Sequence, residues 1–454
     1  MSSFSPRRLL ATCILAAVPI TALALPGAAE AALGTQCSGA NITGQGANVA
    51  KIAQQTVWDP SFNTSTSKSA CSGTQGTKAK PTVGYTTSSA ATGLESWGAN
   101  KHVGTNFSSS NAFIGASEPP NALQTSEIES YETTATPNTL ESIPTFQTAI
   151  AVIVNLPANC VATSKKNKGR LEIDNVDLEK IFRGTLTKWS QLKEDGDALS
   201  GAGCNPDSTI QPIVRKDGAG TTHIFKKYLS LISGATFVDQ KEANRTWNEV
   251  SEGTLNTDWP KEANVTTPTA TGDTAIDTTV AATPSSISYT TFAEARANGS
   301  YTPSPGTGGP GTARFWVPLQ DNGLGTEKFK FADPSSNKDV AAVADSNCKN
   351  TEYTNGVEAF PPLSVFEPWD EVTSSTTEKK YTLCSIVVEL AFKSYSLFPG
   401  TSLEEATTAN NFFRFVTDSK ANGGQKLIEG HDYLALPKGP VLTEAQKGAE
   451  QIAF

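Results

Sequence analysis

The sequence predicts an α/β protein built from two lobes, and three observations support this. Polar or glycine-rich segments recur at the ends of predicted strands, and a helical pattern follows them. Short continuous apolar runs, "AIAVIVNLP" at 149–157 and "CSIVVELAF" at 384–392, indicate buried strands. The chain has 454 residues, more than a single hydrophobic core usually serves. Folds of this kind gather ligands beyond the carboxyl ends of their strands.

The N-terminus predicts export. Arg7 and Arg8 precede the apolar run "LLATCILAAVPITALAL", and small residues follow it up to Ala31. This pattern is typical of a secretory signal peptide over residues 1–31, cleaved after Ala31. No later stretch approaches the ~20 apolar residues of a membrane-spanning helix. We therefore expect a soluble protein in the periplasm or outside the cell.

Cysteine content agrees with export. Beyond the signal peptide lie Cys37, Cys71, Cys160, Cys204, Cys348 and Cys384. Six cysteines allow 15 pairings, and their grouping along the chain favours three disulfides between successive members. None is spaced CxxC, and the three histidines are far apart in the sequence, so we expect neither a metal site nor a cofactor. The formal net charge of −9 argues against nucleic acid as a partner.

The N-terminal part of the mature chain offers three candidate loops. The segment "TGQGANVAKIAQQTVW" at 43–58 predicts a glycine loop followed by a helix. In "YTTSSAATGLESWGAN" two serines precede a helix that we expect to begin near Thr92. The segment "NAFIGASEPPN" predicts a strand that ends in Ser117 and Glu118.

The strand predicted at 149–157 could cross between lobes. The segment 171–192 then predicts a helix that Gly184 stops. Segments rich in Ser, Thr, Gly and Pro at 60–92, 265–285 and 299–312 are expected to form long polar loops.

Further on, "SISYTTFAEARANG" at 286–299 predicts a strand and a short helix. After the buried strand at 384–392, the C-terminal part predicts a helix through Phe413 and Val416 and a last helix from about Thr443.

The stretch "IVRKDGAGTTHIF" at 213–225 predicts a strand-to-helix turn that could hold an anion. The first N–H groups of a helix have no intrahelical partner, and the helix dipole adds positive charge there. Gly218 and Gly220 would let the backbone approach an anion closely, Thr221 can donate a hydroxyl, and Arg215 supplies a charged fork. The alternative is a plain tight turn in which Arg215 only pairs with Asp217.

Taken in order, these segments resemble the phosphate-binding protein of the phosphate ABC transporter, a periplasmic solute-binding protein. The matching pieces are "GQGANVAKI", "FIGASEPP", "AVIVNLP", "LEKIFRGTLTKWSQL", "VRKDGAGTTHIFKKYL" and "YLALP". The resemblance implies a type II periplasmic-binding-protein fold, in which each lobe is a mixed sheet flanked by helices and a two-strand hinge joins the lobes. It places one lobe at 32–150 plus 385–454 and the other at 151–384.

The resemblance also implies a ligand site. Its residues would be Arg215, Asp217, Ala219, Gly220, Thr221, Asn48, Val49, Ser88, Ser89, Ser117 and Glu118. The family's oxyanion-clamping Arg falls on Arg215 and the partner of that Arg on Asp217. Ala219 stands where the family usually has Ser, so one hydroxyl donor is missing while the N–H remains. Asn48 and Val49 replace a Thr and an aromatic residue.

Two further positions are ambiguous in this resemblance. The family's next serine donor aligns with Ala90, so Ser88 or Ser89 could serve after a small shift. The family's Asp, which accepts the proton of phosphate and repels sulfate, falls on Ser117 or Glu118. Glu118 would preserve this discrimination, whereas Ser117 alone would lose it.

The implied function is binding without chemistry. Two lobes would close over phosphate or a similar oxyanion, and the closed monomer would dock on a membrane ABC permease. A secreted phosphatase is the enzyme alternative, but the chain has no GxSxG elbow and no His set for two metals. The runner-up is an extracellular or surface interaction protein that keeps the fold with altered or lost anion binding, because Ala219, Val49 and Ser117 depart from the family pattern.

Overall fold

The computed structural model describes most of the chain beyond the N-terminal region. The described residues are 38–64, 80–100, 106–117, 120–135, 139–156, 171–194, 197–198, 208–251, 253–263, 266–303, 314–321, 330–337, 344–348 and 380–454. The predicted signal peptide, Glu118 and the cysteines Cys37, Cys71, Cys160 and Cys204 lie outside these residues.

One mixed sheet of 11 strands runs through the described part of the molecule, in the order β10-β7-β11-β4-β16-β3-β1-β2 with β12, β13 and β17 attached to its side. Its strands are β1 (Ile42–Ala47), β2 (Val83–Ser88), β3 (Phe113–Gly115), β4 (Leu140–Asn155), β7 (Gln211–Arg215), β10 (Thr266–Ala270), β11 (Ser286–Thr291), β12 (Thr302–Pro303), β13 (Arg314–Val317), β16 (Cys384–Phe392) and β17 (Tyr433–Leu434). Three small ribbons pair β5 (Lys193–Glu194) with β6 (Asp197–Ala198), β8 (Thr236–Val238) with β9 (Asn244–Thr246), and β14 (Leu319–Gln320) with β15 (Phe331–Ala332).

Helices pack around this sheet. The α-helices are α1 (Asp59–Thr64), α3 (Ala90–Ser96), α4 (Ala122–Glu129), α5 (Asn175–Arg183), α6 (Gly220–Ile232), α7 (Asp273–Ala282), α8 (Phe292–Asn298), α9 (Leu403–Val416), α10 (Gly424–Leu427) and α11 (Pro440–Gln451). Short 3-10 or π segments are η2 (Asn48–Ala50), η3 (Ala53–Trp58), η5 (Trp189–Gln191), η6 (Glu249–Ser251), η7 (Gly253–Thr257), η8 (Lys261–Ala263) and η10 (Tyr395–Leu397). The predicted stop at Gly184 is confirmed, because Gly184 ends α5 with a φ of 87°.

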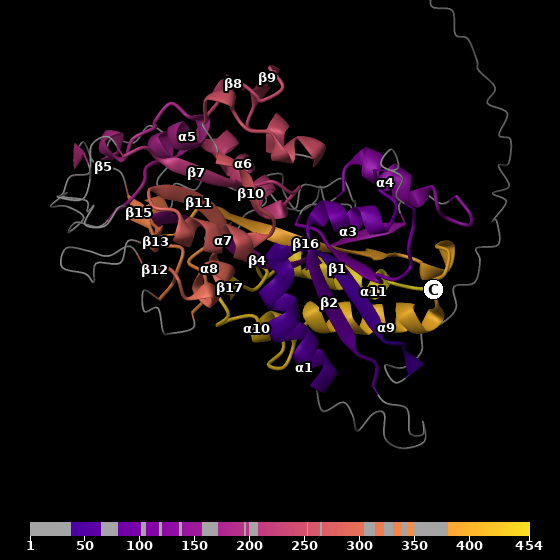
Figure 1. The fold of residues 1–454 in the computed structure, drawn as a ribbon. Coiled ribbons are helices and arrows are strands. Elements are labelled where there is room, and N and C mark those ends of the chain that lie inside the picture. The colour runs from indigo at the N-terminus through magenta and orange to yellow at the C-terminus, as the bar shows by residue number, and fades with distance from the viewer. Residues whose placement is uncertain are drawn as a thin grey trace, which may run out of the picture.

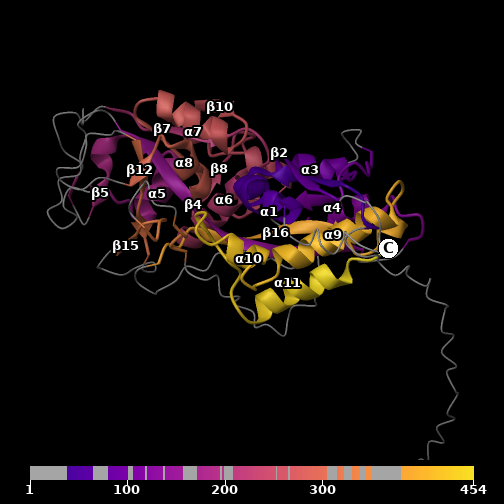
Figure 2. The same cartoon turned by 90° about the horizontal axis from the view of Figure 1, so that it is seen from below.

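Two hydrophobic cores give the molecule two lobes. The first core draws on 42–146, 386–452 and Ala293, and the second on 149–384. Elements from both ends of the chain therefore share the first lobe: in Figure 1 the indigo β1, β2 and α1 lie beside the yellow α9, α10 and α11, away from β7 and α5. Figure 2 shows the same division from below. The predicted α/β architecture of two lobes is confirmed, while the residue limits proposed for each lobe stay a prediction.

Two strands join the lobes. β4 contributes Phe146 to the first core and Ala149 to the second, and β16 contributes Cys384 to the second and Ile386 to the first. The strands pair antiparallel from Leu140 opposite Phe392 to Ala149 opposite Cys384. β16 has the predicted bounds. β4 begins nine residues before the predicted strand at 149–157, so that prediction was too short.

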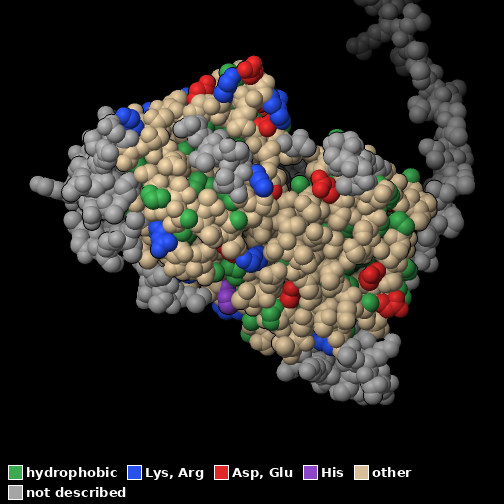
Figure 3. All heavy atoms as spheres, viewed as in Figure 1, with side chains coloured by type: hydrophobic (Ala, Val, Ile, Leu, Met, Phe, Trp, Pro, Cys, Tyr) green, Lys and Arg blue, Asp and Glu red, His purple; other side chains and the backbone are tan. Residues whose placement is uncertain are grey.

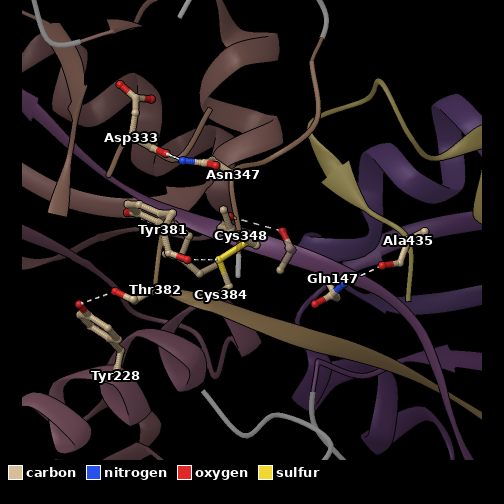
Figure 4. The surroundings of a disulfide bond; sticks show 12 residues. Gln147, Tyr228, Asp333, Asn347, Cys348, Tyr381, Thr382, Cys384 and Ala435 are labelled. Atoms are coloured by element: carbon tan, nitrogen blue, oxygen red, sulfur yellow. Dashed lines mark hydrogen bonds between the residues drawn. A yellow bond between two sulfur atoms is a disulfide. The ribbon is translucent and has the colours of Figure 1, made fainter. Parts of the chain in front are cut away.

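A disulfide lies at the start of β16, at the end of this strand that belongs to the second lobe. Cys348 and Cys384 form a bond with Cα atoms 5.9 Å apart, which confirms the third predicted pair. Figure 4 shows the surroundings, where the hydroxyl of Tyr228 on α6 bonds the hydroxyl of Thr382 at 3.1 Å. The disulfide therefore joins the segment 344–348 to the first residue of β16, within the second hydrophobic core.

Three predictions about loops were wrong. The expected polar loop at 60–92 contains most of α1, all of β2 and the start of α3. The glycines of "TGQGA" lie inside β1, where a side chain on Gly44 would overlap the ring of Phe113 and one on Gly46 would overlap the backbone of Gly115. They are needed for close strand packing and form no loop. The expected polar loop at 265–285 contains β10 and α7.

Candidate anion site between the lobes

The carboxyl ends of parallel strands from both lobes meet at one place. In the first lobe β1 pairs parallel with β2 and β3, so Asn48, Ser88 and Ser117 follow or end strands at the same edge. In the second lobe β7 pairs parallel with β10 and β11, so Arg215 and Asp273 come to one edge as well. This is the arrangement in which α/β proteins gather ligand-binding groups.

The lobes touch each other along these edges. Lys51 of the first lobe donates to Glu294 of the second at 2.9 Å and to Thr274 at 3.1 Å. The Cα of Gly218 faces Ala91 so closely that a Cβ on the glycine would lie 3.3 Å from the alanine methyl group. The two lobes are therefore in direct contact beside the candidate site.

The first turn of α6 presents free backbone donors. The helix begins at Gly220 after the extended Ala219, and its first internal bond runs from the N–H of His223 to the carbonyl of Ala219 at 2.9 Å. The amides of Gly220, Thr221 and Thr222 have no hydrogen-bond partner among the described residues, and all three residues are buried. Buried N–H groups at a helix start are suited to an anion.

Arg215 is buried at the end of β7, with 1% of its surface exposed. Its Nε donates to Asp217 at 2.7 Å, its Nη2 bonds the other oxygen of Asp217, and its Nη1 bonds Asp273. Burial opposes the charge on Arg215, but its hydrogen bond to Asp217 and the charges of the two carboxylates outweigh this and raise its pKa. The predicted pairing of Arg215 with Asp217 is present, and two of the five N–H donors of Arg215 have no partner among the described residues.

Sequence reasoning missed Asp273. It is the first residue of α7, is fully buried and accepts a hydrogen bond from the hydroxyl of Thr221 at 3.2 Å. Burial raises the pKa of its carboxyl, although Arg215 acts to lower it. The segment "TATGDTAI" carries a strand, a glycine and an acidic helix start, a signal that could have marked it as another strand-to-helix turn.

A second missed residue, Asn256, fixes the start of α6. Its Oδ1 accepts the N–H of Ala219 and its Nδ2 donates to the carbonyl of Ala219, both at 3.2 Å. The ammonium of the buried Lys226 in turn donates to the carbonyls of Val250, Asn256 and Asp258 at 3.1, 2.7 and 2.6 Å. The N–H of Ala219, which the sequence suggested as an anion donor, is therefore already engaged by the protein.

Ser117 closes the site from the first lobe. It follows β3, is fully buried, and its hydroxyl has no hydrogen-bond partner among the described residues. Its side chain lies against the Cα of Gly220, where a Cβ would overlap both the hydroxyl and the Cβ of Ser117. A buried hydroxyl without a partner is costly, so a ligand oxygen at this place would satisfy it.

Gly220→Ala is expected to weaken anion binding at least about tenfold, because the added methyl group keeps Ser117 away from the first turn of α6. Calorimetry and small-angle scattering would measure affinity and closure. Gly234→Ala is the matched control, since a Cβ on Gly234 meets nothing within 4 Å. Equal affinity of both variants would contradict this contact.

The other predicted residues of the first lobe have structural partners. Asn48 donates its Nδ2 to the carbonyl of Ser88 at 2.6 Å, and a Cβ on Gly272 would lie 3.5 Å from the same nitrogen. Ser89 caps α3 by accepting the N–H of Thr92 at 3.0 Å. Val49 is fully buried, and its carbonyl accepts the hydroxyl of Tyr433. These residues line the edge that faces the second lobe, while their role toward a ligand stays a prediction.

Metal binding and membrane insertion find no support in the described ranges. There, no group of three His, Cys, Asp or Glu side chains is arranged to hold a metal ion. None of the helices described above is long and apolar enough to span a membrane.

Comparisons with known proteins give one family and one fold. The model of the PBP superfamily domain matches residues 61–347. Among solved structures, the chain is similar to a phosphate-binding protein from Stenotrophomonas maltophilia, with a TM-score of 0.55, 14% identity, and coverage of 90% of this chain and 93% of the other. It is similar to the ancestral soluble variant of the human phosphate binding protein, with a TM-score of 0.56, 16% identity, and coverage of 91% and 93%. It is also similar to a high-affinity periplasmic phosphate-binding protein with bound phosphate, with a TM-score of 0.52, 15% identity, and coverage of 89% of this chain and 92% of the other. No curated protein sequence matches the chain.

Proposed function

The chain belongs to the PBP superfamily, and from this premise we propose that it captures phosphate, or a closely similar oxyanion, between its two lobes. One observation carries the proposal: among the described residues, the buried amides of Gly220, Thr221 and Thr222 and the buried hydroxyl of Ser117 have no hydrogen-bond partner. Asp273 links the hydroxyl of Thr221 to the guanidinium of Arg215. Burying a charged anion is tolerable only where such donors satisfy its oxygens. The expectation that the chain is a binding protein and no enzyme is confirmed at the level of the family.

Charges around Arg215 favour an anion that carries a proton. The guanidinium of Arg215 lies between the carboxyls of Asp217 and Asp273. A fully ionised anion has no proton to donate to the Asp273 carboxylate and would be repelled by its charge. Hydrogen phosphate can donate its proton to that carboxylate, whereas sulfate has none to donate. Asp273 therefore supports phosphate over sulfate, and the same role for Glu118 stays a prediction.

The mechanism of delivery follows from the two-lobed fold. The closed monomer would carry the anion to a membrane ABC permease, and opening about β4 and β16 would release it. The predicted signal peptide at 1–31 supports export to the periplasm or the exterior.

Calorimetry on the ligand-stripped protein at neutral pH tests the proposal. We expect phosphate to bind and sulfate not to displace it. In Asp273→Asn the amide can donate to a sulfate oxygen, so sulfate should compete at least about tenfold better than with the unchanged protein. Asp418 follows α9 and lies outside the anion site. Asp418→Asn is therefore the control and should leave the competition between sulfate and phosphate unchanged.

Two outcomes would contradict parts of this proposal. Unchanged exclusion of sulfate by Asp273→Asn would remove Asp273 from the discrimination. Failure of the unchanged protein to bind either anion would end the receptor hypothesis.

A second candidate function is favoured by one observation. Asp273 already engages Nη1 of Arg215 and the hydroxyl of Thr221, donors that an anion could otherwise use. If this carboxylate has taken the anion's place, the protein would be the interaction protein that keeps the fold and has lost its ligand. Phosphate binding by Asp273→Asn alone, with none by the unchanged protein, would favour this second candidate.

A further inference from the structure

A cleft next to the anion site has room for much more than phosphate. It has a volume of about 410 Å³ and is lined by both lobes. The first lobe contributes α3 and α4, and the second contributes Gly218, Gly253 and the η7 residues Asn256 and Thr257. The molecular surface is hollowed between the two lobes on the face that Figure 3 shows. Ligand sites for small organic molecules have volumes of about 300–1,000 Å³, so the cleft falls in that range.

The cleft adjoins the anion site through residues next to the start of α6, although the described anion donors themselves do not line it. Asn256 lines the cleft and holds both the N–H and the carbonyl of Ala219, the residue before the first turn of α6. Gly218 lines it two residues before Gly220, opposite Ala91 at the start of α3. A group attached to an anion held by that first turn would therefore be directed along residues that already line the cleft.

The lining suits a neutral group with hydroxyls. Ala90, Ala91, Leu94 and Leu123 supply apolar surface, and Leu123 is 64% exposed, which is unusual for a large hydrophobic side chain. Four amide side chains, those of Asn100, Asn121, Gln124 and Asn256, supply hydrogen-bonding groups, and among the described lining residues Glu95 alone is ionisable. Apolar surface combined with fixed amides can bind the CH faces and the hydroxyls of a polyol or sugar.

Two of these amides are held in place by the helix they belong to. In the capping box of α4, Oδ1 of Asn121 accepts the N–H of Gln124 at 2.9 Å, and Oε1 of Gln124 accepts the N–H of Asn121 at 3.0 Å. Their oxygens are thus occupied, and their NH₂ groups have no partner among the described residues. Fixed donors of this kind lose little conformational entropy when they bind a hydroxyl.

We propose that the ligand is a phosphate monoester of a small polyol or sugar, with its phosphate at the α6 start and its organic part in the cleft. This inference rests on the proposed function, because the same anion site holds the phosphate group. With inorganic phosphate alone, the cleft would be filled with water, because its volume of about 410 Å³ is many times the roughly 30 Å³ that one water occupies in the liquid.

Calorimetry with four ligands tests this inference: inorganic phosphate, methyl phosphate, glycerol 3-phosphate and glucose 6-phosphate. We expect the last two to bind at least about tenfold more tightly than methyl phosphate, which has no hydroxyls for the amides. Leu123→Trp, at an exposed position, should fill part of the cleft and remove this advantage while leaving inorganic phosphate unaffected. Val238→Trp, at an exposed position on β8, is the matched control.

The outcomes separate the two proposals. If inorganic and methyl phosphate bind as tightly as the larger esters, the cleft holds no ligand and the phosphate receptor still stands. If the esters bind more tightly but Leu123→Trp changes nothing, their organic part lies elsewhere and the inference is overturned. If none of the four ligands binds, the anion site itself fails and both proposals fall.

Discussion

Replacing Arg215 with lysine is expected to weaken phosphate binding at least about 100-fold, which corresponds to ~2.7 kcal/mol. Lysine keeps the charge but has no planar fork, so it cannot hold Asp217 through two nitrogens, bond Asp273 and still direct donors at an anion. Calorimetry would measure the affinity. Because the side chain is buried, the variant tests geometry with the charge retained.

Arg183→Lys is the matched control. Arg183, whose side chain is 27% exposed, pairs at 2.9 Å with the buried Glu179 of the same helix α5. It should leave phosphate affinity unchanged. Arg215→Ala goes further, because it leaves the buried carboxyl of Asp273 and the partly buried carboxyl of Asp217 without their cation. It should lower the free energy of unfolding by about 3–5 kcal/mol. An affinity of Arg215→Lys equal to that of Arg183→Lys would refute the role of the guanidinium.

The stability of the protein is expected to fall as the pH rises from about 5 to about 8. Glu389 on β16 is fully buried and accepts a hydrogen bond from Gln54 at 2.5 Å. Burial raises its pKa to about 8, and burial raises the pKa of nearby Asp59 to about 7. The folded state therefore holds protons that the unfolded chain, with ordinary pKa values near 4, releases in this range.

The direction of this pH dependence follows from the linkage between proton binding and folding. A carboxyl with a raised pKa in the folded state contributes its full stability below the unfolded pKa and loses it as the pH rises through the folded pKa. Each such group lowers the free energy of unfolding by up to about 1.4 kcal/mol per pH unit in the window. Urea unfolding at pH 5, 6, 7 and 8 would measure the slope.

Glu389→Gln should reduce this slope, because the amide is neutral at every pH and keeps the size of the side chain. Glu242→Gln is the control, since the side chain of Glu242 is 74% exposed and pairs only with Lys261 at the surface. If the slope of Glu389→Gln equals that of the unchanged protein, Glu389 does not hold a proton in the folded state.

Elements with an uninterrupted apolar pattern could be predicted from the sequence. The run at 384–392 has no polar break except Ser385 and Glu389, and it forms β16 with the predicted bounds. The strand-to-helix turn at 213–225 appears as β7 and α6, and with it the pairing of Arg215 and Asp217. Here local pattern and tertiary packing agree.

Elements in which tertiary packing overrides local preference were missed. The helix α7 is rich in threonine, a poor helix former, but it buries Ile276 and Val280 in the second hydrophobic core. The sequence therefore suggested a loop, and Asp273 at its start was overlooked. Asn256 was missed for a different reason, because it comes to Ala219 only through a contact 37 residues away.

The start of β4 was missed for a third reason. Glu141, Ser142, Thr145 and Pro144 make its first half look like a loop, but all lie buried against β16. The proline is accommodated where the register between the strands shifts at Val387 and Val388. No local pattern announces a strand whose polar residues are paired by a partner strand more than two hundred residues away.

The position of β16 in the sheet sets an order of folding. The second core is complete within 149–384, so that lobe can form from one continuous stretch of chain. The first core is not, because β16 lies between β4 and β3 and the strands β3, β1 and β2 are joined to the rest of the sheet only through it. A chain that emerges N-terminus first must therefore keep its earliest strands unassembled until about its last sixth follows, from β16 onward. This makes the first lobe slow to form and exposed to aggregation meanwhile.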